Sequence, residues 1–69
     1  MYVTILFPSI PLEKRHEIED TLEEEGFDVI GAGMCINSGV QDIGVEVPRS
    51  KLRRLRSIVK SFGFGFEIE

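Results

Sequence analysis

The sequence has few of the side chains that enzymes and metal proteins most often use. Its 69 residues contain one cysteine, Cys35, one histidine, His16, and no tryptophan. A single cysteine excludes an internal disulfide and a zinc site built from several cysteines, and it favours a reducing compartment. No nucleophile–histidine pair can be drawn around a lone histidine without an evident partner. We therefore expect a protein that is not an enzyme and that holds no metal and no cofactor.

The two residues with reactive side chains have ordinary structural explanations. Cys35 is expected to be a small buried thiol, and His16 a solvated residue of an acidic helix. The stretch "GAGMCI" begins like a dinucleotide-binding fingerprint, but the third glycine of that pattern would fall at Ile36. We expect a bulged strand there.

Long hydrophobic runs are also missing. The run "YVTILF" after Met1 is too short to span a membrane, and it lacks the basic leader of a secretion signal. We expect a cytoplasmic protein without a membrane partner. A chain of this length forms one domain, which buries only about 60% of its unfolded surface.

Apolar periodicity and turn residues divide residues 1–69 into six elements. Alternation favours strands, spacings of three and four favour helices, and Gly, Pro and Asn-Ser-Gly mark the ends. Gly31 and Gly33 predict a bulge or a bend in the second strand. The expected elements are a strand at 2–8, a helix at 12–26, strands at 27–39 and 40–48, a helix at 49–63 and a strand at 64–69.

This order predicts the α+β class. Strand, helix, strand, strand, helix, strand is the order of the ferredoxin-like fold, a βαββαβ domain with both helices on one face of an antiparallel sheet. The expected strand order is 4-1-3-2. On the first strand Val3, Ile5 and Phe7 should face the helices, and on the third strand Ile43, Val45 and Val47.

The C-terminal stretch "SFGFGFEIE" contains the centre of the RNA-recognition signature, Gly-aromatic-Gly-aromatic. In a strand, however, Phe62, Phe64, Phe66 and Ile68 share one face, and the helix layer needs that apolar face. The RNA motif requires its aromatic side chains on the opposite, open face. We therefore interpret this stretch as a core strand.

The open face of the sheet is one candidate interface. Tyr2, Thr4 and Leu6 lie along its central strand, and Gly44 and Gly65 leave their surroundings flat. An exposed sheet face with apolar content often packs against a second copy or another protein. Glu46 and Glu67 belong to this candidate interface, and with Asp42 and Glu69 they make the face acidic, which disfavours a phosphate backbone.

Charge is divided unevenly along the chain. Residues 1–47 have ten acids and two bases, a net charge of −8, whereas residues 48–69 have six bases and two acids, a net charge of +4. A basic stripe recurs at spacings of four, three and four on the second helix, and an acidic stripe has the same spacing on the first. The stripes are Arg49, Arg53, Arg56 and Lys60, and Glu13, Glu17, Asp20 and Glu24. They either remain solvated, face each other as weak exposed ion pairs, or meet a partner.

Three functions remain open on these observations. The first is a small non-enzymatic interaction module that binds another protein through the basic stripe and modulates it, by inhibition or neutralisation. The second follows from element order, which resembles that of the amino-acid-binding ACT domains and implies a ligand-sensing homodimer; the first turn, "FPSIP", has no glycine where ACT domains carry one. The third, least favoured, is nucleic-acid binding by the second helix.

Overall fold

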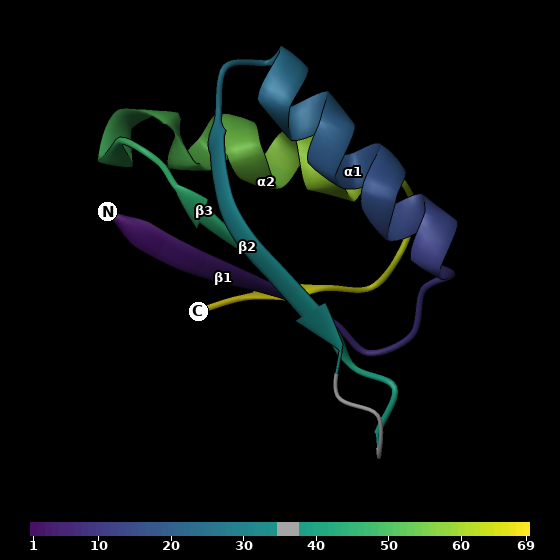
Figure 1. Cartoon of the computed structure of the whole chain (residues 1–69). Helices are drawn as coiled ribbons and strands as arrows, with labels where there is room; N and C mark the ends of the chain where they lie inside the picture. The colour runs from purple at the N-terminus through teal and green to yellow at the C-terminus, as the bar shows by residue number, and fades with distance from the viewer. Residues whose placement is uncertain (35–37) are drawn as a thin grey trace.

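A computed structural model describes residues 1–34 and 38–69 of the chain. It contains four strands, two α-helices and a 3-10 turn (Figure 1). The predictions made for Cys35, Ile36 and Asn37 lie outside the described residues. The elements are β1 (Tyr2–Phe7), α1 (Leu12–Glu24), β2 (Asp28–Met34), β3 (Gln41–Glu46), η1 (Arg49–Lys51), α2 (Leu52–Lys60) and β4 (Glu67–Ile68).

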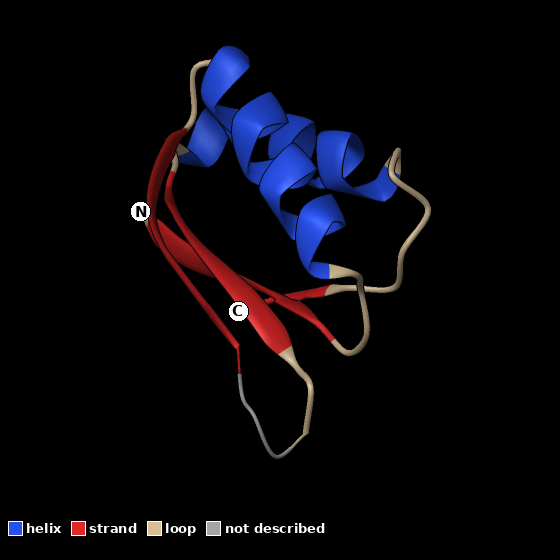
Figure 2. Ribbon diagram, turned by 45° about the vertical axis from the view of Figure 1, so that its right-hand side comes forward, coloured by secondary structure: helices blue, strands red, loops and turns tan. Residues whose placement is uncertain are grey.

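The strands form one antiparallel sheet in the order β2-β3-β1-β4, so the predicted order is confirmed. β1 and β3 occupy the centre and pair over six positions, from Tyr2 opposite Glu46 to Phe7 opposite Gln41. Both helices cover the same face of the sheet, and the other face is left open (Figures 1 and 2). The chain therefore has two layers, in the α+β class.

The core lies between the sheet and the helices. The predicted alternation is confirmed, because Val3, Ile5 and Phe7 of β1 are buried, as are the inward residues of the third strand. The remaining core side chains come from the helices and their connections. They are Ile10, Ile18, Leu22, Phe27, Leu55, Ile58 and Val59.

The end of α1 follows the sequence signal closely. Gly26 has a φ of 91°, a left-handed conformation that glycine adopts without steric cost. Its N–H donates to the Glu23 carbonyl, and the Phe27 N–H donates to the Leu22 carbonyl. This pair of bonds is the Schellman motif, and it turns the chain so that Phe27 enters the core.

β2 contains the predicted irregularity. Val29 pairs with Val45 and Gly31 with Gly44, so Ile30 is an extra residue in the ladder. Gly33 continues the regular register opposite Asp42. The predicted bulge is therefore next to Gly31 alone, and Ile30 is its unpaired residue.

The predicted helix at 49–63 was too long at both ends, because the α-helix spans only Leu52–Lys60. Residues Arg49–Lys51 form a 3-10 turn after Pro48, and the α-helix begins at Leu52. A 3-10 turn has three residues per turn, so the four-residue spacing from Arg49 to Arg53 does not follow one α-helical face.

The predicted last strand was also too long. β4 pairs with β1 at Ile68 opposite Ile5 and at Glu67 opposite Leu6, and the backbones of Glu69 and Thr4 exchange two further hydrogen bonds. The apolar residues before and within it still turn inward, although they are half-buried instead of fully buried. The rings of Phe66 and Phe7 lie with their centroids 6.4 Å apart, so the interpretation of this stretch as core is confirmed.

Candidate interaction surfaces

α2 holds its basic residues on a firmly packed element. Leu55, Ile58 and Val59 are buried against the sheet, so the opposite side of the helix faces solvent. Arg53, Arg56 and Lys60 lie on that exposed side. The helix fixes their backbone positions, and only their side chains need to order when a partner binds.

The exposed bases extend beyond the predicted stripe. We define the basic surface as the six bases of η1 and α2, every one of which is exposed: Arg49, Lys51, Arg53, Arg54, Arg56 and Lys60. Arg54 forms an ion pair with Glu25, at the end of α1. Among the described residues, no ion pair involves the other five. The predicted stripe omits Lys51 and Arg54, because it follows one face of an ideal helix, but the sequence already shows six bases between Arg49 and Lys60.

The acidic stripe of α1 is solvated as well. Its four residues are exposed, and no ion pair within the described part of the chain joins them to the basic stripe. The hypothesis that the stripes face each other was therefore wrong. Glu17 instead pairs with Lys14 of its own helix at 2.9 Å, and this hydrogen bond, with the charge of Glu17, raises the pKa of Lys14.

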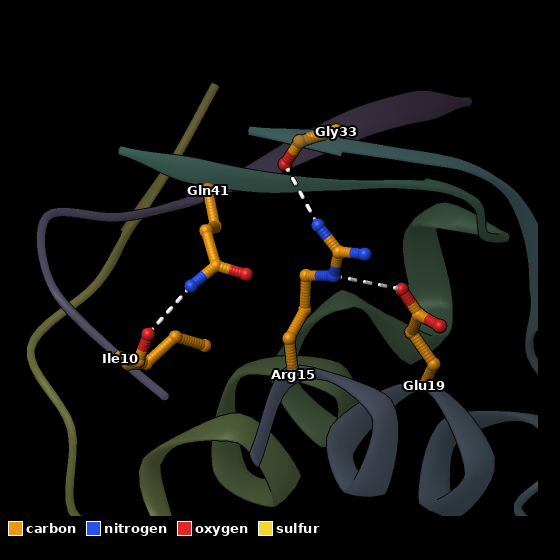
Figure 3. A network of polar contacts seen from close by, with 5 residues as sticks. All are labelled: Ile10, Arg15, Glu19, Gly33 and Gln41. Carbon is orange, nitrogen blue, oxygen red and sulfur yellow. Dashed lines mark hydrogen bonds and ion pairs between the residues drawn. The ribbon is translucent and has the colours of Figure 1, made fainter. Parts of the chain in front are cut away.

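A half-buried polar contact ties α1 to β2 (Figure 3). The Arg15 Nη1 donates to the Gly33 carbonyl at 3.1 Å, and its Nε lies 3.4 Å from Glu19 Oε1. The two side chains are 13% and 21% exposed. Since the guanidinium is held by its own helix and by the strand, this contact has a structural role.

His16 is exposed on α1, as predicted. Across residues 1–34 and 38–69 there is no group of three or more His, Cys, Asp or Glu side chains placed to hold one metal ion. That same part of the chain has no cavity and no helix both long and apolar enough to cross a membrane.

The centre of the open sheet face is covered by an aromatic ring. A Cβ at Gly44 would lie 2.8 Å from the Tyr2 Cζ, so the ring lies directly over this glycine and buries it. Glu46 pairs with the terminal ammonium of Met1 at 2.9 Å. Thr4 and Leu6 are half-buried, and Glu67 beside Leu6 is exposed.

The edge strand β2 carries exposed apolar side chains that the sequence interpretation did not select. Ile30 is 56% exposed and Met34 is 52% exposed. The sequence could have indicated this exposure. The stretch "DVIGAGM" has one charged residue in seven and belongs to a strand expected at the edge of the sheet, where apolar side chains are less covered.

Comparison with known proteins gives no relative for this chain: no model of a protein family matches it, and no curated protein matches it either.

Proposed function

We propose that this chain is a single ferredoxin-like domain that acts as a non-enzymatic interaction module. Its basic surface binds an acidic surface of another protein and modulates that protein. The observation that supports this proposal is the set of six exposed bases on η1 and α2, of which only Arg54 has an ion-pair partner among the described residues.

Electrostatics favours a docking role for such a surface. Clustered charges of one sign steer an oppositely charged partner during encounter and disfavour wrong partners. Charged side chains that only kept the protein soluble would not need to share one sign within an element. Here all six bases of η1 and α2 share a sign that is opposite to the net charge of the rest of the chain. The concentration of bases on one element is thus better explained by a partner.

A protein partner fits better than a nucleic acid. The chain has a net charge of −4, and some of its acidic side chains lie on the open sheet face, so the molecule as a whole repels a phosphate backbone. Residues 49–60 contain no aromatic side chain. Proteins that bind single-stranded nucleic acid combine Lys and Arg side chains with aromatic rings, on which the nucleobases stack.

A pull-down from nuclease-treated lysate of the source organism tests the proposal. The wild-type chain should retain one stoichiometric protein partner, identified by mass. The double variant Arg53→Glu/Arg56→Glu should lose it, because both side chains are exposed and reversal changes charge without affecting the core. Lys14→Glu is the matched control, an exposed base on α1 reversed outside the basic surface.

Three other outcomes would overturn the proposal. The partner could be retained by the double variant, which removes the basic surface from the interaction. Nucleic acid, recovered when nuclease is omitted and lost steeply as salt rises, would favour the nucleic-acid function. Recovery of this chain alone would favour the ACT-like homodimer.

A further inference from the structure

The outer edge of β2 is open to backbone pairing. β2 is the last strand of the sheet and pairs only with β3. Apart from the Gly33 carbonyl, which accepts from Arg15, its backbone makes no described hydrogen bond outside that ladder. An edge of this kind presents N–H and C=O groups to which an extended segment can add.

β2 has only part of the usual protection of an edge strand, namely the β-bulge at Ile30. Natural edges are also blocked by lysine, proline, inward-pointing charges or a covering helix or loop. From Val29 to Met34 this strand has no charged residue and no proline, and Ile30 and Met34 expose large apolar side chains. The bulge at Ile30 disturbs the first half of the edge, and residues 31–34 keep a regular register in which only the Gly33 carbonyl is already occupied, by Arg15.

The surroundings of this edge are acidic. Arg15, Glu19 and Glu23 follow one another at four-residue spacing, so Glu23 lies on the side of α1 that reaches β2. Glu23 is exposed, and so is Asp28 at the start of β2, on the open side of the sheet opposite Glu46. The start of β2 therefore has one carboxylate on the helix side, Glu23, and one on the open side, Asp28. No described ion pair involves either residue.

We propose that the β2 edge binds an extended segment of a partner protein that carries apolar and basic side chains. The segment adds to the sheet as a fifth strand. Its apolar side chains cover Ile30 and Met34, and its basic side chains meet Glu23 and Asp28. This surface is separate from the basic surface, so the two proposals stand or fall independently.

A second copy of the chain is a poorer occupant of this edge. Pairing of two β2 strands would bring the adjacent α1 helices of both copies together, and each helix has six acids against two bases. Like charges at that contact would disfavour the dimer, whereas a basic segment is attracted by the same charges.

The probe is a fluorescein-labelled peptide of seven residues, the length of β2, in which pairs of valines and pairs of lysines alternate, so that both faces of the added strand carry both residue types. Fluorescence anisotropy should show binding, and amide shifts in NMR spectra should map to Asp28–Met34. A valine–glutamate peptide and a valine–lysine peptide interrupted by prolines should not bind. These two peptides separate the contributions of charge and backbone without changing the protein.

The double variant Ile30→Lys/Met34→Lys should weaken binding at least about tenfold, which is about 1.4 kcal/mol. Both positions are exposed, so thermal unfolding should be nearly unchanged. Ser50→Lys/Ser57→Lys is the matched control, because it adds the same two charges at exposed positions of η1 and α2. It should weaken binding much less.

Several results would overturn the inference. They are no binding of the valine–lysine peptide at about 1 mM, equal binding of either control peptide, shifts outside β2, and equal loss in both lysine variants. Self-association of the chain that disappears in Ile30→Lys/Met34→Lys would instead assign the edge to a second copy.

Discussion

Gln41 is a polar side chain within the apolar core. It is 3% exposed, and its Nε2 donates to the carbonyl of Ile10 in the loop before α1 (Figure 3). Its Oε1 is buried without a hydrogen-bond partner among the described residues. Alternation along β3 predicts that this position faces inward, but it cannot reveal that an amide holds the loop there.

Replacing Gln41 should therefore destabilise the protein. Gln41→Ala should lower the free energy of unfolding by about 2–3 kcal/mol, because it leaves the Ile10 carbonyl unpaired and opens a cavity. Gln41→Leu should cost less, since it keeps most of the volume and also removes the unpaired Oε1. Urea denaturation measures both values. Equal stability of Gln41→Ala and the wild type would contradict the role of this bond.

Neighbouring arginines of α2 differ in whether they already have an ion-pair partner within the chain. Arg54 is held by Glu25, whereas Arg53 beside it has no ion-pair partner in the described chain. An exposed pair contributes only about 0–1 kcal/mol to stability. Arg53 and Arg56 are thus suitable for charge reversal, because neither contributes a described contact to the fold.

At the level of elements, the last ten residues contribute more to the core than to the sheet. Only Glu67–Ile68 form β4, while Phe62, Phe64 and Phe66 pack against the core from the connection. Gly63, with a φ of 83°, turns the chain after α2. The RNA-like letters of this stretch therefore encode a turn and a row of inward rings.

Removal of one ring tests this account. Phe66→Ala should lower the free energy of unfolding by about 1–2 kcal/mol, less than the roughly 3–5 kcal/mol typical of a fully buried phenylalanine. Glu67→Ala, at the next position but on the exposed face, should change it by less than about 0.5 kcal/mol. An unchanged Phe66→Ala variant in chemical denaturation would mean that the ring does not pack on the core.

The bulge of β2 should not depend on glycine. Gly31 has no positive φ, and a Cβ there would meet nothing within 4 Å. Gly31→Ala should be neutral or stabilise the protein by up to about 1 kcal/mol, because alanine restricts the unfolded chain. Gly26→Ala is the contrasting control, since its φ of 91° should make it destabilising. Equal losses in thermal unfolding would contradict this account of the bulge.

The sequence predicted the order of the elements, the strand order and most inward side chains, since these follow from apolar periodicity. Several boundaries differed from the prediction, and two of the differences have a clear physical reason. Alternation in residues 64–69 reports which side chains are buried. Strand pairing also needs a neighbouring backbone within reach, and β1 offers it only to residues 67–69. The 3-10 turn after Pro48 depends on local geometry that periodicity does not record.

The candidate surfaces were predicted less completely. Arg53, Arg56 and Lys60 of the basic stripe are exposed on α2, and the basic surface also includes bases that one helical stripe omits. Pairing between the stripes could not be decided without the relative rotation of the helices. Exposure of Ile30 depends on the bulge, whose position was not fixed by the two glycines.

The whole molecule separates its charge between elements. α1 and the open sheet face are acidic, while η1 and α2 carry six exposed bases. Opposite charges on two copies of the chain attract each other. Salt at physiological concentration screens this attraction beyond about 8 Å. Two partners of opposite charge could bind at once, one on the basic surface and one at the β2 edge.

The central claim is that the basic surface binds an acidic protein, and the affinity for the captured partner tests it most directly. Isothermal titration should show that Arg53→Glu/Arg56→Glu weakens binding at least about 100-fold, or about 2.7 kcal/mol, while Lys14→Glu stays within about twofold of the wild type. Binding by the double variant that equals the wild type would contradict the account.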